Sequence, residues 1–204
     1  MLPPAGEASD EQLAARCQTG DYAAFEKLYQ RYQRPILAYI YQITRNYEQS
    51  ACIAQDVFIR VFEHVDRFDT QRRFSTWFYT IARNAAIDYL QSHRRKMMVN
   101  FTDIEHGEAG NSIASNTSAV NEPIEDRLSR REASEHLAKA VANLPLSNRE
   151  IIELIVFQGL TYEDASVILG GISLGTLRSR MFHALRRMRH ELSQVAGENG
   201  ENLL

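Results

Sequence analysis

The side chains that could do chemistry in this sequence are grouped cations rather than a catalytic set. Between Ile172 and His190 there are five arginines and no carboxylate. They are Arg178, Arg180, Arg186, Arg187 and Arg189. A guanidinium can grip a phosphate, or the edge of a guanine, with two hydrogen bonds. Because the whole chain carries a formal net charge of -3, this basic cluster is local, and it predicts binding of nucleic acid.

The residues around the arginine cluster predict a helix-turn-helix. Thr161 can cap a short first helix, Gly170-Gly171 supplies the positive φ angles of a tight turn, and Ser173 can cap a second helix. The apolar stripe of that second helix is Leu177, Met181, Leu185 and Met188. In a helix-turn-helix the second helix enters the major groove of DNA. Two amphipathic helices joined by glycines are also ordinary in proteins that bind no DNA, so the unopposed arginines carry the prediction.

A second basic segment lies earlier, over residues 72–96. One carboxylate, Asp88, faces six cations there. They are Arg72, Arg73, Arg83, Arg94, Arg95 and Lys96. Aromatic residues begin the segment, and cations interleaved with aromatic rings suit a surface that follows a phosphate backbone and stacks on unpaired bases. The segment therefore predicts contact with single-stranded DNA.

Some aromatic and aliphatic members of this segment have another interpretation. Trp77, Ile81 and Leu90 are expected to pack inside a helix bundle. Phe68 lies in the polar stretch 66–73, which is too polar to be core and reads as a loop. Phe68 is therefore the better candidate for touching a base.

Apolar residues at helical spacing predict four helices before residue 98. Asp10 and Asp21 can cap the first two, and Pro35 should kink or divide the second. The third is expected over residues 51–65 and the fourth from Phe74 to about Lys96. The inner face of the third is Ile53, Val57, Phe58, Val61, Phe62 and Val65.

The composition changes over residues 99–124, where small polar residues replace large apolar ones. From Val99 to Leu128 six carboxylates face one arginine, which predicts a flexible acidic linker. The linker is either a solvated spacer or a strand that occupies a basic channel on a partner. It separates residues 1–98 from a second domain, residues 125–192, followed by a polar tail over 193–204. The predicted fold class is all-α, with two small helical domains, and Ser147 is expected to cap a helix in the second.

Composition and cysteine usage limit the remaining classes. The chain is 44% hydrophobic and 24% charged, as in soluble globular proteins. No apolar run approaches 18 residues, and the start MLPPAGEASDEQ is neither basic nor hydrophobic, so we expect no stable membrane insertion and no signal or transit peptide. Cys17 and Cys52 are expected to be buried or half-buried free thiols, a disulfide or redox switch being the less favoured alternative. A cytoplasmic protein fits these features.

No pattern of residues indicates catalysis. The sequence holds no paired-carboxylate site, no glycine-rich phosphate loop and no histidine-cysteine ligand cluster, and its six histidines are scattered. We therefore expect no catalytic residue, no metal and no cofactor. An enzyme is the least favoured class.

Four stretches carry a resemblance to a known family. In order they are GDYAAFEKLYQRYQRPILAY, QDVFIRVFEHVDRFD, FSTWFYTIARNAAIDYL and LTYEDASVILGGISLGTLRSRMFHALRRMR. This series resembles the extracytoplasmic-function (ECF) sigma factors, a group of the sigma-70 family of bacterial transcription initiation factors. The likeness covers about residues 10–192, with the acidic linker between the third stretch and the fourth. It implies a protein that directs core RNA polymerase to specific promoters and helps to open them.

The resemblance also implies roles for particular residues at promoter DNA. Residues matching those that touch bases of the −35 element are Arg178, Ser179, Phe182 and His183, and those that look more like phosphate contacts are Arg180 and Arg186. Phe68 and the loop through Arg72 and Arg73 match the loop that captures a base flipped from the −10 element. Asn84 and Asp88 lie on the helix that reads that element, and Arg94 and Arg95 match its phosphate-contacting end.

Protein partners follow from the same resemblance. Residues matching the stretch that docks on the clamp helices of the β′ subunit are Gln55, Asp56, Phe58 and Ile59. The second domain resembles helices that engage the flap of the β subunit, and the linker would run through the polymerase's basic RNA path. An anti-sigma factor is expected as a further partner, one that could hold the protein at the inner membrane if it is itself membrane-bound.

Two features depart from the family pattern. Ala51-Cys52 stands where relatives commonly carry a Glu-Asp pair, and the turn at Gly170-Gly171 is one residue longer than in many relatives. The alternative hypothesis is a helix-turn-helix regulator that binds promoters without acting as a sigma subunit. That hypothesis leaves the segment from Gln55 to Phe74 without an explanation.

Overall fold

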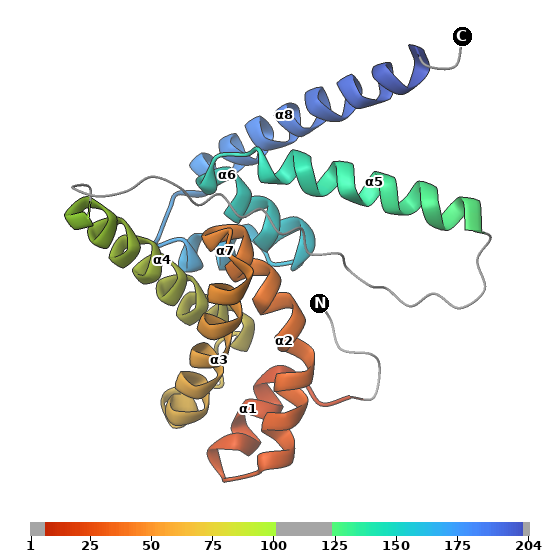
Figure 1. Cartoon of the computed structure of the whole chain (residues 1–204). Helices are drawn as coiled ribbons and strands as arrows, with labels where there is room; N and C mark the ends of the chain where they lie inside the picture. The colour runs from red at the N-terminus through yellow and green to blue at the C-terminus, as the bar shows by residue number, and fades with distance from the viewer. Residues whose placement is uncertain (1–6, 101–123, 202–204) are drawn as a thin grey trace.

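The computed structural model describes residues 7–100 and 124–201, which are almost wholly helical and contain no β-strand (Figure 1). The all-α prediction is therefore confirmed. The helices of the first part are α1 (Asp10–Gln18), α2 (Tyr22–Thr44), α3 (Tyr47–His64), the 3-10 turn η1 (Val65–Arg67) and α4 (Phe74–Asn100). Those of the second part are α5 (Ile124–Ala142), α6 (Leu146–Ile151), the π-helical turn η2 (Ile152–Phe157), α7 (Tyr162–Ile168) and α8 (Leu174–Glu201). Apart from its two ends, the predicted acidic linker lies outside the described residues.

Polar caps begin the first three helices of this part, and two starts differ from prediction, those of α1 and of α3, which is capped by Asn46 and begins at Tyr47 rather than at residue 51. Asp21 caps α2 by accepting a hydrogen bond from the Ala24 N–H, as expected. The cap of α1 is Ser9 rather than Asp10, because Ser9 and Gln12 form a reciprocal capping box. Helix α2 continues through Pro35 without dividing.

An aromatic cluster forms the core of the first part. The rings of Tyr32, Phe74, Phe78 and Tyr79 lie 4.9 to 6.3 Å from their neighbours, and α2, α3 and α4 supply the surrounding aliphatic residues. Tyr39 adds an edge-on contact with Tyr79 at 5.3 Å. These large side chains on three helices fix how α4 is presented at the surface.

The second part differs from prediction at three places. Helix α6 begins after Pro145 without a side-chain cap, so Ser147 lies inside the helix. The buried stripe of α8 contains Ala184 in place of Leu185, which is exposed. Helix α8 also extends to Glu201, past the start of the predicted polar tail. A spacing of four, three and four residues from Leu177 through Ala184 to Met188 explains the second difference, since it follows the 3.6-residue period more closely.

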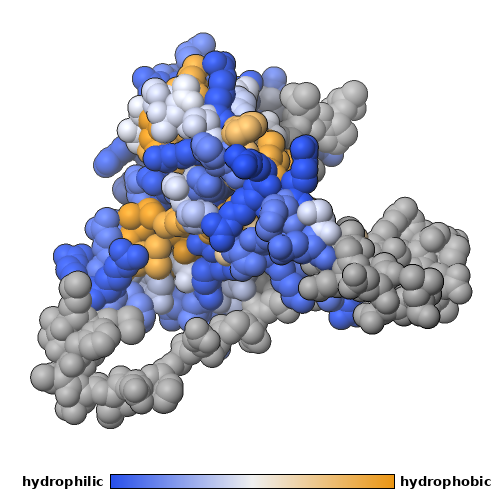
Figure 2. Space-filling model, turned by 90° about the horizontal axis from the view of Figure 1, so that it is seen from above, coloured by the Kyte–Doolittle hydropathy of each residue, from blue (hydrophilic) through white to orange (hydrophobic). Residues whose placement is uncertain are grey.

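The two parts pack against each other. Helix α4 contacts α7, and α2 contacts α6 (Figure 1). The face seen from above is mostly hydrophilic, with hydrophobic residues in separate patches (Figure 2). Within residues 7–100 and 124–201, no helix is both long and apolar enough to cross a membrane.

Candidate nucleic-acid interface

Helices α7 and α8 form a helix-turn-helix whose turn is braced at several points. Thr161 and Asp164 make a reciprocal capping box at the start of α7. Gly170 and Gly171 have φ angles of 86° and 82°, a region that side chains with a Cβ rarely adopt. The Ser166 hydroxyl donates to the Ile172 carbonyl oxygen at 2.6 Å, across the turn. The predicted motif and its turn glycines are therefore present.

The buried stripe of α8 turns the predicted DNA-reading residues outward. Leu177, Met181, Ala184 and Met188 pack inward. Exposed on the opposite side are Arg178, Ser179, Phe182, His183, Arg186 and Arg187, while Arg180 is half-buried. Phe182 is 63% exposed and adds an apolar ring to this otherwise polar and cationic face. This face can enter a groove without rearrangement of α8.

Two contacts order side chains on this face. The Arg178 guanidinium lies over the Tyr162 ring, 5.9 Å from its centroid, which links the two helices of the motif. The rings of Phe182 and His183 lie 5.6 Å apart. Further along α8, His183, Arg186, Arg187 and His190 line a shallow open depression. A cationic depression of this kind suits a phosphate.

The predicted −10 residues on α4 are also accessible. Asn84, Asp88, Arg94 and Arg95 are all exposed, and Arg72 in the preceding loop is exposed as well. Residues 84, 88, 91 and 95 recur at helical spacing, so they share one face of α4. The structure therefore places Asn84, Asp88 and Arg95 on one face of α4, and Arg94, next to Arg95, widens this exposed strip at its end.

Phe68 does not have the predicted free position. Its side chain is only 4% exposed, and its ring packs 5.1 Å from that of Trp77 and 5.5 Å from that of Phe74. The interpretation of Phe68 as a free base-contacting ring is therefore wrong for this conformation. The surrounding sequence is polar, but one large apolar side chain in a short loop is enough to anchor the loop to the core.

Two of the six cations counted in the segment 72–96 are paired with the second part of the chain. Arg83 Nε donates to Glu150 Oε1 at 2.7 Å, and Arg73 Nη1 donates to Asp164 Oδ2 at 2.7 Å. Thr76 donates to the other oxygen of Asp164 at 2.8 Å. The sequence count of positive charge therefore overstates the basic surface of α4. In this conformation Arg73 must leave Asp164 before it can bind a phosphate.

The polar contact between the two parts continues into the interior. The Tyr79 hydroxyl donates to Gln158 Oε1 at 2.6 Å, and Gln158 Nε2 donates to Glu153 Oε1 at 2.8 Å. Burial raises the pKa of Glu153, although the hydrogen bond from Gln158 opposes it. At Asp164 burial also acts to raise the pKa, but hydrogen bonds from Thr161 and Thr76 outweigh it and lower the pKa. Asp164 is therefore a stable carboxylate partner for Arg73.

The predicted polymerase-binding stretch, residues 55–59, lies on α3. Gln55, Asp56 and Ile59 are exposed. Phe58 is only 8% exposed and packs against the rings of Tyr29 and Phe78, which confirms its predicted place on the inner face, so it supports the predicted docking stretch from below.

Sequence reasoning missed an aromatic ridge beside this stretch. Phe62, placed on the inner face by its spacing, is 46% exposed and stacks on Tyr22 at 6.0 Å. Tyr22 is 74% exposed, and Phe25 contacts Phe62 edge-on at 5.0 Å. Ile59 is one turn before Phe62 on α3 and is also exposed. The ridge forms because Tyr22, at the first turn of α2, lies against the end of α3. The spacing of residues within one helix does not reveal a contact between two helices.

Comparison with known proteins identifies the family. The profile for Sigma-70 region 2 matches residues 28–96, and the profile for Sigma-70, region 4 matches residues 134–188. The RNA polymerase sigma-H factor of Pseudomonas aeruginosa is 32% identical over 178 residues, covering 86% of this chain and 89% of that protein. The ECF RNA polymerase sigma factor SigW of Bacillus subtilis is 31% identical over 177 residues, covering 86% and 92%.

Two solved structures share the fold. One is CnrH in complex with the cytosolic domain of CnrY, with a TM-score of 0.62 and 20% identity, covering 92% of this chain and 99% of that one. The other is the sigma factor RpoE in complex with the anti-sigma factor NepR from Bartonella quintana, with a TM-score of 0.65 and 21% identity, covering 83% and 96%.

The chain belongs to the ECF sigma factors of the sigma-70 family, as its resemblance indicated. It is an RNA polymerase sigma factor, and proteins of this class initiate transcription by binding rather than by catalysis.

Proposed function

We propose that this sigma factor directs core RNA polymerase to promoters by reading a double-stranded −35 element with α8 and a melted −10 element with α4 and the loop before it. The observation that carries the proposal is the outward face of α8: five arginines lie between Ile172 and His190 with no carboxylate among them, and Arg187 reaches the next acidic residue, Glu191, at 3.4 Å. The chain as a whole is acidic, so a basic face here is not a general property of its surface.

Arg178, Ser179, Phe182 and His183 are the proposed readers of −35 bases, and Arg180 and Arg186 are proposed phosphate contacts. A major-groove helix suits this element because each base pair shows a distinct donor and acceptor pattern there. Arg178 is held over Tyr162, so its guanidinium is partly ordered before DNA arrives. That arrangement lowers the ordering cost of binding.

The proposed −10 surface is the strip of Asn84, Asp88, Arg94 and Arg95 together with the loop through Arg72 and Arg73. Its exposure beside an aromatic core suits a single strand, because the strip offers polar and cationic contacts along its length. No hydrolysis is needed to keep the strands apart, since binding of the unpaired strand offsets the loss of base pairing.

Core polymerase is proposed to dock on Gln55, Asp56 and Ile59 of α3, where the clamp helices of the β′ subunit bind relatives. The ridge of Tyr22 and Phe62 extends this surface with exposed apolar area next to Ile59. Solitary exposed aromatics are ordinary, but a stacked pair beside a charged patch is typical of a protein interface. The flap of the β subunit is the proposed partner of the second part.

Domain boundaries and location are part of the same proposal. We assign residues 1–98 to promoter opening and clamp binding, residues 99–124 to the acidic linker and residues 125–192 to −35 recognition. The chain is proposed to be cytoplasmic and to be regulated by an anti-sigma factor, free or membrane-bound, since the RpoE structure of similar fold was solved with an anti-sigma factor.

The test is run-off transcription with bacterial core polymerase on a library of promoter fragments, with and without the protein. We expect protein-dependent transcripts that start at defined sites and reveal both promoter elements. DNA binding without any redirected polymerase would instead favour the independent helix-turn-helix regulator. The substitution of Ala51-Cys52 for the commoner Glu-Asp pair would then be the first suspect.

Replacing Arg178 or Phe182 by alanine should weaken recognition of the −35 element by about 10-fold or more, since a good base contact contributes about 1–3 kcal/mol. Affinity for core polymerase should not change, because both side chains are exposed on α8, away from the docking surface on α3. Gel-shift assays on wild-type and scrambled −35 fragments, with a pull-down of core polymerase, measure the two effects. Arg34→Ala, at an exposed arginine of α2 with no proposed contact to DNA or polymerase, is the control, and an α8 variant that lost polymerase instead would refute the assignment.

A further inference from the structure

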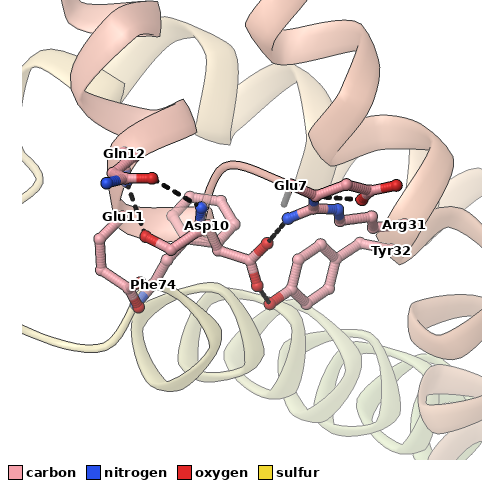
Figure 3. A network of polar contacts seen from close by, with 8 residues as sticks. Glu7, Asp10, Glu11, Gln12, Arg31, Tyr32 and Phe74 are labelled. Carbon is pink, nitrogen blue, oxygen red and sulfur yellow. Dashed lines mark hydrogen bonds and ion pairs between the residues drawn. The ribbon is translucent and has the colours of Figure 1, made fainter. Parts of the chain in front are cut away.

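Helix α1 contacts both ends of the loop 69–73 through side chains two turns apart. Gln18 Nε2 donates hydrogen bonds of 2.8 Å to the carbonyl oxygens of Val65 and Phe68, just before the loop. Glu11 Oε1 accepts a hydrogen bond of 3.1 Å from the N–H of Phe74, just after it (Figure 3). An α-helix makes two turns in about 7 residues, so Glu11 and Gln18 lie on one face of α1.

The contact at Phe74 satisfies a backbone N–H that helix geometry leaves free, and Gln18 adds a second donor to the Val65 carbonyl, which already accepts from the Phe68 N–H at 3.1 Å. The Gln18 amide has two N–H donors, which match the two carbonyls at the end of η1. The Phe74 N–H belongs to the first turn of α4, whose N–H groups have no partner within the helix. A carboxylate there also faces the positive end of the helix dipole. The entry and the exit of the loop are therefore both tied to α1.

Helix α1 is itself anchored firmly enough to act as a support. Asp10 accepts hydrogen bonds of 2.6 Å from Arg31 and from the Tyr32 hydroxyl on α2 (Figure 3). Burial, and then the charge of Asp10, raises the pKa of Tyr32, which keeps the hydroxyl a proton donor. Leu13 is fully buried beneath the same helix.

The loop between the two ties projects outward as a compact turn. The Arg72 N–H donates to the Asp69 carbonyl oxygen at 2.9 Å, and the Gln71 N–H donates to Asp69 Oδ1 at 3.0 Å. Asp69, Gln71 and Arg72 are exposed, and Thr70 is half-buried. With Phe68 buried beneath it, this turn is what the loop presents to DNA.

We propose that α1 is a rigid support that positions the loop 69–73 to hold an unpaired promoter base, with Gln18 and Glu11 as positioning residues. This inference rests on the proposed −10 function of the loop. A loop already fixed at both ends loses less conformational entropy when a base binds, so more of the contact energy appears as affinity. The residues of α1 touch no DNA in this scheme and act through the loop.

The test measures how much affinity one base contributes. Holoenzyme, assembled from the full chain and core polymerase, is bound to single-stranded −10 oligonucleotides from a promoter found by run-off transcription. Each base is replaced in turn by an abasic site. With wild-type protein, loss of the captured base should lower affinity about 10-fold, the size expected for one hydrogen bond to a charged group such as the exposed Arg72. With Gln18→Leu the same loss should cost less than about 2-fold, while affinity for the abasic strand stays unchanged.

Two other variants separate positioning from folding. Gln30→Leu makes the same change at an exposed glutamine of α2, whose side chain donates a weak 3.4 Å hydrogen bond to Glu26, and should behave as wild type. Glu11→Leu should act as Gln18→Leu does, whereas Glu11→Gln keeps an oxygen acceptor and should restore the base-dependent affinity. Melting temperatures show whether each variant folds. If Gln18→Leu does not fold, comparison of Glu11→Leu with Glu11→Gln tests the inference.

The outcomes are distinct. Full base-dependent affinity in Gln18→Leu and Glu11→Leu would overturn the inference. Equal loss of affinity for the intact and the abasic strand would also overturn it, because α1 would then only stabilise the fold. Failure of wild-type holoenzyme to bind any promoter strand would refute the proposed function itself, which the run-off assay shows independently.

Discussion

Phe68→Ala is expected to lower the free energy of unfolding by about 3–5 kcal/mol, the cost of deleting a buried phenylalanine ring. The ring is 4% exposed and contacts those of Phe74 and Trp77. For a domain of this size such a loss is a large share of the total stability. Urea unfolding followed by circular dichroism measures it.

The matched control is Phe182→Ala, which removes the same atoms from an exposed site on α8. Its effect on stability should lie within about 0.5 kcal/mol of zero, as for ordinary surface substitutions. The two variants should therefore have opposite effects. Phe182→Ala should keep normal stability but bind the −35 element poorly, and Phe68→Ala should unfold at a lower urea concentration. If Phe68→Ala proved as stable as Phe182→Ala, the ring would not be core in solution, and its role as a base contact would return.

Much of the fold could be predicted because it depends on signals within single helices. The caps Asp21, Thr161 and Ser173 and the turn glycines Gly170 and Gly171 act on neighbouring residues, so local sequence is sufficient to find them. The reading face of α8 could be predicted for the same reason. Once one stripe of a helix is apolar, the opposite face is exposed.

The errors occurred where a residue's environment depends on another helix. Phe62 fits the apolar spacing of α3, yet α2 covers its position only in part, with Tyr22 and Phe25, and the rings of Phe62 and Tyr22 remain exposed. Phe68 has polar neighbours in sequence but apolar ones in space. Arg83 counts as a free cation in a sequence sum, while its carboxylate partner lies 67 residues away. Tertiary packing decides such positions, and a one-helix pattern carries no information on it.

Glu150→Ala should destabilise the chain by about 3 kcal/mol and loosen the contact between its two parts. Glu150 is 5% exposed and Arg83 is 21% exposed, so removal of the carboxylate leaves a guanidinium largely buried without its partner. Breaking a buried pair from one side typically costs about 3–5 kcal/mol, and the partial exposure of Arg83 places this case at the lower end. Thermal unfolding measures the first effect, and the radius of gyration from solution scattering measures the second.

A double-mutant cycle separates the pair itself from the burial of its charges. Arg83→Met combined with Glu150→Leu replaces both charges by apolar side chains of similar size, and we expect it to recover most of the loss caused by Glu150→Ala. The radius of gyration should then return to the wild-type value. If instead the double variant stayed expanded, charge pairing rather than packing would hold α4 against α6. Arg73 and Thr76, which bind Asp164 across the same contact, would then be the next residues to test, because their release exposes the start of the −10 surface.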